Sequence, residues 1–221
     1  MLVSHLKKFI FVKTSKTAGT SVEVFFEKFC FPDNEWVFSH GRDEYINPLS
    51  GIVGCRGAVK GDVKFYNHMP ATKIRTEIGE DIWEHYFKFT IIRNPFDKMV
   101  SAYFHFEKSQ NPDKYSMDNL TDIQRFRNWV SDGGKISDRY TYLINGKVAV
   151  DYFIRFESLK EDIETVCQKL QLNYDLADLP TLKSEHRDRT IKLKDFYDTP
   201  TEKIVRELYK FEIEYFNYDL W

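Results

Sequence analysis

Apolar residues occur in short runs separated by turn-forming residues, and these runs predict a chain that alternates strands with helices. The clearest strands are the runs at 9–12 and 87–93, which are rich in aromatic and β-branched residues. Asn145 and Gly146, between apolar residues, predict a tight hairpin turn. Further short strands are expected at 36–39, 63–66, 140–144, 148–150 and 151–156.

Helices are expected between these strands. In 119–131 and 157–170 the apolar residues recur at the spacing of one helix face. The other predicted helices cover about 20–31, 71–78, 81–85, 96–109 and the stretch that follows Pro200. The alternation predicts an α/β fold, a three-layer sandwich with a mostly parallel central sheet and helices on both faces. Ligands of such folds bind outside the C-terminal ends of the strands.

The first predicted strand leads through a small polar turn into the first predicted helix. The N-terminus of a helix carries unpaired N–H groups and favours negative charge. Thr20 and Ser21 are good helix-capping residues, Gly19 allows close approach of the backbone, and Lys16 can place a point charge at the same spot. The stretch therefore predicts an anion site, although an ordinary strand–turn–helix with a solvated lysine remains an alternative.

The order of residues in the turn indicates which anion is bound. A nucleoside-triphosphate loop reads Gly-x-x-x-x-Gly-Lys-Ser/Thr, whereas Lys16 precedes Gly19 and no Gly-Lys-Ser/Thr follows. The sequence Lys-Thr-Ala-Gly-Thr-Ser at 16–21 instead resembles the P-loop-like phosphosulfate loop of sulfotransferases, most closely the carbohydrate-type family. Ser15 stands where many members carry proline. The resemblance implies that the 5′-phosphosulfate of 3′-phosphoadenosine 5′-phosphosulfate (PAPS) is bound by Lys13, Lys16, Thr17, Ala18, Gly19, Thr20 and Ser21.

The second predicted phosphate site lies at the end of the strand at 87–93. Arg93-Asn94-Pro95, with Ser101 on the helix that follows, resembles the family's site for the 3′-phosphate. Arginine offers a fork of donors matched to phosphate oxygens, and Ser101 returns to the same helix side after about two turns. Taken alone, Arg93 and Asn94 are also typical of a strand-end ion pair and a helix cap.

His68 is the candidate general base. It lies in His68-Met69-Pro70-Ala71, which matches the segment that carries the catalytic histidine in carbohydrate-type members. An acceptor hydroxyl is a poor nucleophile, and imidazole is suited to removing its proton near neutral pH. The alternative is a histidine that caps the helix after Pro70. His105 is a weaker candidate for a place near the nucleotide, since a packed helix histidine explains it as well.

The resemblance extends over nearly the whole chain. Asp-Tyr-Phe-Ile-Arg-Phe-Glu-Ser-Leu at 151–159 matches a family segment in which we expect Arg155 and Glu157 to form a buried structural pair. Residues 179–184 and 214–218 also fit the family pattern. Arg187 and Arg189 either close over the nucleotide or lie in a solvated loop.

Composition limits the compartment and the partners. The chain has 221 residues, enough for a single sulfotransferase domain over 1–221, and its net charge of −2 disfavours a nucleic-acid protein. No apolar run is long enough to span a membrane, and residues 1–8 lack the apolar centre of a signal peptide. Three widely spaced cysteines indicate reduced thiols. A cytoplasmic protein, or a catalytic domain without its membrane anchor, is expected.

The expected reaction moves the sulfuryl group of PAPS to a hydroxyl of a carbohydrate or related small molecule by in-line displacement. His68 is the base, Lys16 and the N–H groups of 19–21 stabilise the leaving phosphate, and no metal is expected. Two alternatives stay open: a kinase that uses nucleoside triphosphate, and a nucleotide-binding protein without turnover. The sequence indicates neither the acceptor nor the oligomeric state. Four basic residues are candidates for binding an anionic sugar: Arg42, Arg56, Lys60 and Lys64. The alternative is that they are isolated basic residues on the surface.

Overall fold

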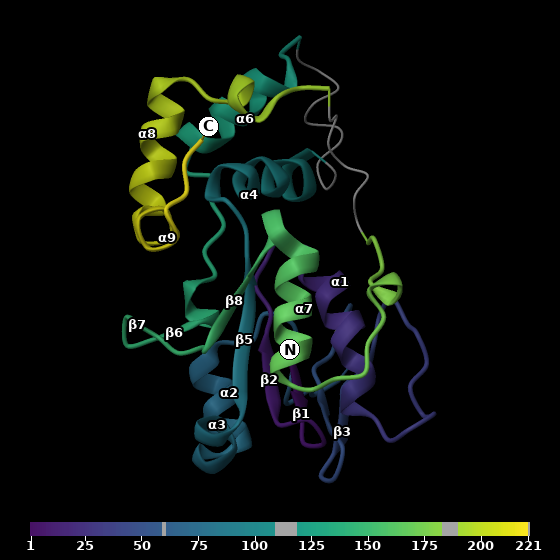
Figure 1. Cartoon of the computed structure of the whole chain (residues 1–221). Coiled ribbons are helices and arrows are strands. Elements are labelled where there is room, and N and C mark those ends of the chain that lie inside the picture. Colours follow the sequence, from purple (N-terminus) through teal and green to yellow (C-terminus); the bar gives the residue numbers. More distant parts are fainter. Residues whose placement is uncertain (59–60, 109–118, 183–189, 221) are drawn as a thin grey trace. The chain divides into compact units, whose positions relative to one another are not determined.

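The computed structural model describes residues 1–58, 61–108, 119–182 and 190–220. It divides into two compact units, each described here by itself (Figure 1). The first unit comprises Met1–Ile92 with Ser137–Leu182, and the second comprises Arg93–Ile136 with Lys183–Trp221. None of the helices in the described part is long and apolar enough to cross a membrane.

The first unit is built on a mixed sheet with strand order β3-β4-β1-β2-β5-β8. Its strands are β1 (Leu2–Ser4), β2 (Phe9–Val12), β3 (Tyr45–Asn47), β4 (Gly51–Val53), β5 (Phe87–Ile92) and β8 (Tyr152–Arg155). Parallel pairing is confined to β2, β5 and β8, whose connections run through helices, whereas β1, β3 and β4 pair antiparallel. The α/β class is confirmed, and its parallel part holds the two strands that precede the predicted phosphate sites.

Helices cover both faces of this sheet. Figure 1 shows α1 (Gly19–Glu27) beside α7 (Leu159–Lys169), and both pack into one core with Phe9, Phe11 and Phe89. On the opposite face, Lys88 Nζ donates to the carbonyl oxygen of Trp83 in α3. The other elements of the unit are α2 (Ala71–Ile78), α3 (Glu80–His85), the β6 (Leu143–Ile144) and β7 (Lys147–Val148) hairpin, and the 3₁₀ turns Lys28–Cys30, Arg139–Thr141, Phe156–Ser158 and Leu176–Asp178.

The second unit is helical in its described part. Its elements are α4 (Pro95–Ala102), which continues as a π-helix over Tyr103–Lys108, α6 (Asp122–Ser131), a 3₁₀ turn over Leu193–Phe196, α8 (Thr199–Leu208) and α9 (Lys210–Phe216). Its core is aromatic: the ring of Phe126 lies 5.6 Å from that of Phe196 and 5.8 Å from that of Tyr103, edge to face. Thr121 and Gln124 form a capping box that begins α6.

Several short elements differ from the sequence prediction. β1 was not expected, because three residues are too few to show a period, yet it lies between β2 and β4 with every side chain buried. Residues 36–39 form no strand, and the predicted strand at 63–66 is reduced to an isolated bridge between Cys55 and Tyr66. The last predicted helix is two helices, α8 and α9, separated at Tyr209.

Candidate active site

The turn between β2 and α1 has a strained backbone. Lys16 (φ 60°) and Ala18 (φ 63°) are both left-handed, a conformation that costs a residue with a side chain about 1–2 kcal/mol. Neighbouring contacts hold the turn in place: the Thr14 hydroxyl bonds the carbonyl oxygen of Ile91 in β5, and the Ser15 N–H donates to Asp138 Oδ2 over 2.7 Å. Strain that the surroundings enforce in this way is common at ligand sites.

The N-terminus of α1 carries no side-chain cap among the described residues. Its N-cap is Ala18, which has no oxygen to offer, and the first turn holds no acid. The prediction that Thr20 and Ser21 cap the helix is therefore wrong, since both lie inside its first turn. The Ser21 N–H donates to the carbonyl oxygen of Ala18 (2.9 Å), and its hydroxyl accepts from the Leu182 N–H (3.3 Å). The positive end of the helix dipole, at the N-terminus of α1, therefore remains available to attract an anion.

Gly19 is required by packing. A Cβ at this position would lie 3.0 Å from Cγ of Lys13 and 3.1 Å from the carbonyl oxygen of Thr14. Thr17 is buried below the turn, with its hydroxyl 2.9 Å from that of Thr14. Lys16, by contrast, is only half-buried. The first unit thus brings the predicted phosphosulfate residues into one loop.

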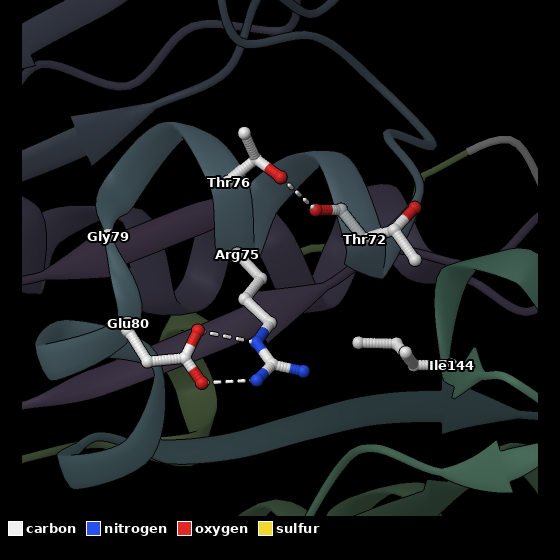
Figure 2. A pocket seen from close by; sticks show the side chains of 6 residues that line it. All are labelled: Thr72, Arg75, Thr76, Gly79, Glu80 and Ile144. Atoms are coloured by element: carbon white, nitrogen blue, oxygen red, sulfur yellow. Dashed lines mark hydrogen bonds and ion pairs between the residues drawn. The ribbon is translucent and has the colours of Figure 1, made fainter.

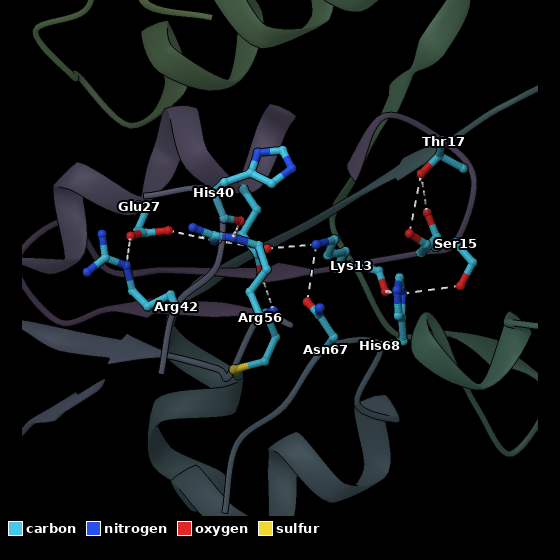
Figure 3. Close-up of polar contacts among 12 residues, drawn as sticks. Lys13, Ser15, Thr17, Glu27, His40, Arg42, Arg56, Asn67 and His68 are labelled. Atoms are coloured by element: carbon cyan, nitrogen blue, oxygen red, sulfur yellow. Dashed lines mark hydrogen bonds and ion pairs between the residues drawn. The ribbon is translucent and has the colours of Figure 1, made fainter. Parts of the chain in front are cut away.

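His68 lies against this loop (Figure 3). Its Nδ1 is 3.2 Å from the carbonyl oxygen of Lys13 and 3.2 Å from Oγ of Ser15. A carbonyl oxygen only accepts, so Nδ1 carries the proton and Nε2 keeps its lone pair. The alternative of a helix cap does not hold, because the N-cap of α2 is Pro70 with no side-chain hydrogen bond. Burial, followed by the charge of Lys13, lowers the pKa of His68 to about 4, so the ring is neutral at pH 7.

Lys13 is part of a buried ionic contact. Its Nζ donates to Glu23 Oε2 (2.7 Å) and to Asn67 Oδ1 (3.1 Å), and its side chain is 3% exposed (Figure 3). Glu23 is fully buried. Burial alone would raise its pKa, but the charges of Lys13, the N-terminal ammonium and Arg56 hold the pKa of Glu23 well below its usual range. This carboxylate is therefore charged at any working pH.

The ionic contacts continue away from the loop. Arg56 Nη1 lies 3.2 Å from Glu23 Oε2 and 2.6 Å from Glu27 Oε2, and the guanidinium of Arg42 contacts the other oxygen of Glu27. Two of the four bases considered for an anionic sugar are thus internal ion-pair partners. Of the others, Lys64 pairs with Glu77 over 2.9 Å, and Lys60 lies outside the described residues.

The second unit holds the other predicted phosphate residues. Arg93 contacts Asp97 Oδ2 through Nε (2.7 Å) and Nη2 (2.6 Å), and the Asn94 side chain accepts from the Phe96 N–H (3.0 Å). Arg93 thus forms the ion pair, and Asn94 the helix cap, that were the sequence-based alternative to a phosphate site. Neither contact excludes phosphate binding by Arg93. Ser101 is half-buried in α4. Its pairing with Arg93 at a 3′-phosphate stays a prediction.

Other predicted residues fall elsewhere. Arg155 and Glu157 are exposed, so the expected buried pair is wrong, because β8 is an edge strand. His105 lies in the π-helix after α4, with its ring 4.8 Å from that of Phe106. Arg187 and Arg189 lie outside the described residues. Among the described residues, no group of His, Cys, Asp or Glu is arranged to hold a metal ion.

Three site residues were missed from the sequence: Asp138, Glu23 and Asn67. Asp138 follows the loop by more than a hundred positions and is 1% exposed, and nothing in its local sequence marks it. The sequence did contain a signal for Glu23, because this acid stands within an apolar helical stretch. Its neighbours in the sequence, Val22 and Val24, are both buried. An acid at such a position needs a buried cation.

Two hollows adjoin α2. The larger, about 440 Å³, is lined by Thr72, Arg75, Thr76, Gly79, Glu80 and Ile144, and Figure 2 shows the Arg75 guanidinium paired with Glu80 across it. The smaller, about 370 Å³, includes Tyr66, Met69 and Lys73, on either side of His68 in the sequence. Lys73 Nζ donates to the Tyr66 hydroxyl over 3.3 Å.

Comparison with known proteins places this site in a family. The chain is 32% identical over 108 residues to an uncharacterised protein of Archaeoglobus fulgidus, a match that covers 49% of this chain and 87% of that protein. No solved structure matches the chain significantly. The model of the family described as "Sulfotransferase family" matches residues 1–219. Since that match includes the loop of Lys16, His68 and the Arg93 segment, the chain belongs to the sulfotransferase family.

Proposed function

We propose that this chain is a PAPS-dependent O-sulfotransferase in which His68 is the general base. Membership of the sulfotransferase family supports sulfuryl transfer in general. The observation that supports the finer proposal is the contact between His68 Nδ1 and the anion loop, at the carbonyl oxygen of Lys13 and the hydroxyl of Ser15. An imidazole that is neutral at pH 7 and keeps its proton on Nδ1 can accept the proton of an incoming hydroxyl at Nε2.

The donor is bound by its two phosphate ends. The 5′-phosphosulfate lies at the N-terminus of α1, where the N–H groups of Gly19 and Thr20 and the charge of Lys16 meet it. The N–H of Ser21 is used within the helix, so it is left out of this set. Arg93 and Ser101 hold the 3′-phosphate, as the resemblance implies.

The reaction is a single displacement at sulfur. The acceptor oxygen forms a bond to sulfur while the bond from sulfur to the 5′-phosphate oxygen breaks, and 3′-phosphoadenosine 5′-phosphate leaves. The acceptor proton passes to Nε2 of His68. Lys16 and the helix N-terminus stabilise the negative charge that develops on the leaving oxygen, the same use of positioning and electrostatics as in phosphoryl transfer.

The acceptor proposed is a carbohydrate. The His68-Met69-Pro70-Ala71 segment supports this choice by its resemblance to carbohydrate-type members. The hollow lined by Tyr66, Met69 and Lys73 supports it as well, since an aromatic ring and an ammonium suit a sugar that bears an acidic group.

The test is calorimetric titration with 3′-phosphoadenosine 5′-phosphate, followed by sulfate transfer from labelled PAPS to a panel of sugars and alcohols. His68→Ala should lower turnover roughly 10²–10⁴-fold, the usual contribution of a general base, and leave nucleotide affinity near wild type. Absence of nucleotide binding would exclude the proposed donor. Binding without transfer to any acceptor would leave a non-catalytic protein, and magnesium-dependent ATP turnover would favour a kinase.

A further inference from the structure

The Lys13 side chain is directed into the protein. Its ammonium is satisfied by Glu23 Oε2 and Asn67 Oδ1, and its stem packs under Gly19, where a Cβ would lie 3.5 Å from Lys13 Cε. Turning this ammonium toward a bound phosphate would break its 2.7 Å ion pair with the Glu23 carboxylate, which is 0% exposed and would keep only the N-terminal ammonium and Arg56 as partners. Breaking a contact within a buried ionic cluster is costly, so Lys13 is poorly placed to be a nucleotide ligand.

The same residue contacts the His68 segment at two points. Its carbonyl oxygen accepts from Nδ1 of the imidazole, and its ammonium donates to the side chain of Asn67, the residue before His68. His68 has a left-handed backbone (φ 56°), which needs support from its surroundings. One bond fixes the ring and its tautomer, and the other holds the strained segment from which the ring projects (Figure 3).

We propose, as a deepening of the proposed function, that Lys13 is a positioning residue for His68, anchored by Glu23 and Asn67, and does not bind the nucleotide. Lys16 alone then supplies the lysine charge to the phosphosulfate. The buried pair of Lys13 and Glu23 sets the orientation of the base and fixes a positive charge close to it.

The charged groups that act on His68 come from three elements. Lys13 follows β2, the ammonium of Met1 precedes β1, and Glu23 belongs to α1. After burial, the two cations lower the pKa of His68, and Glu23 raises it with a smaller effect. Removing the charge of Lys13 alone should therefore raise the pKa of the imidazole, since the larger of the two cationic effects disappears and Glu23 stays in place.

The experiment compares wild type with Lys13→Met, which removes the lysine charge and leaves Glu23 paired with the N-terminal ammonium (2.6 Å) and Arg56 (3.2 Å). The His68 imidazole is titrated by NMR in the nucleotide-free protein, so this readout does not depend on any sulfotransferase activity. We expect the pKa of His68 to rise by a measurable fraction of a unit or more, and the Kd for 3′-phosphoadenosine 5′-phosphate to stay within about threefold. Lys88→Met, which removes another buried lysine at the start of β5, is the matched control and should change neither value.

An unchanged pKa of His68 in Lys13→Met would overturn the proposal, and so would a tenfold or greater loss of nucleotide affinity. If Lys13→Met does not fold, Asn67→Ala tests the second contact. It should lower kcat roughly tenfold through misplacement of the base, with the Kd for the nucleotide unchanged. A wild-type kcat in Asn67→Ala would refute the role of that contact. Failure of wild type to bind the nucleotide would count against the proposed donor, and the NMR result would still decide the role of Lys13.

Discussion

The low pKa of His68 makes a quantitative prediction about stability that is independent of catalysis. Burial and the nearby charge of Lys13 lower the pKa of this imidazole from 6.5 to about 4. Between these two values the unfolded chain binds a proton at His68 and the folded protein does not. Stability therefore rises with pH across this window and is lost as the pH falls. Linkage gives a loss from this one group of about 2 kcal/mol at pH 5 and about 3 kcal/mol at pH 4, relative to neutral pH.

The matched variant is His68→Asn. Asparagine tolerates the left-handed backbone at this position (φ 56°) and has no titratable group. The free energy of unfolding of both proteins is measured in urea from pH 7 to pH 4. The free energy of unfolding of wild type should fall by about 2 kcal/mol more than that of the variant between pH 7 and pH 5, whatever the difference between the two proteins at pH 7. Every other titrating group is shared, so it cancels in the comparison. Parallel stability curves for the two proteins would refute the argument that burial and the charge of Lys13 lower the pKa of His68.

Four further substitutions test the remaining parts of the site, and a fifth serves as a control. Lys16→Ala should lower kcat about 10²–10³-fold in a sulfate-transfer assay with a smaller effect on donor affinity, and unchanged turnover would remove Lys16 from the mechanism. Arg93→Ala should weaken 3′-phosphoadenosine 5′-phosphate roughly 10–100-fold by calorimetry and adenosine 5′-phosphate far less, because a charge-assisted bond to the 3′-phosphate is lost. Equal weakening of the two ligands would contradict that assignment. Gly19→Ala should destabilise the protein by about 1–3 kcal/mol in urea unfolding, since its Cβ would meet backbone and side-chain atoms at 3.0–3.1 Å. A gain in stability would show that the loop has room. Arg56→Met breaks a buried ion pair and should lower the free energy of unfolding by about 3–5 kcal/mol. Arg75→Met, in the exposed pair with Glu80, should have a far smaller effect on stability, because solvent screens that pair. Equal effects of the two substitutions would mean that burial does not decide the strength of these pairs.

Most of the longer elements were predictable from local pattern. The helix Ala71–Ile78 is found with the bounds expected, and the strand Phe87–Ile92 ends one residue before the predicted end at Arg93. Aromatic and β-branched runs favour strands, and Pro70 marks a helix start. Short elements were not. β1 and β3 have three residues each, and such strands form only because a neighbour pairs with them.

The sequence alone determined the α/β class and indicated the candidate anion loop and the candidate base, since these depend on local order: a strand, a turn with Lys16 and Gly19, and the segment of His68. Only the tertiary structure decided how these parts act on one another. It turned Lys13 and Arg56 inward to buried acids, brought Asp138 to the backbone of Ser15, and set His68 against the carbonyl oxygen of Lys13. The physical reason is that a side chain's charge state and tautomer depend on burial and on partners distant in sequence, which no local pattern encodes.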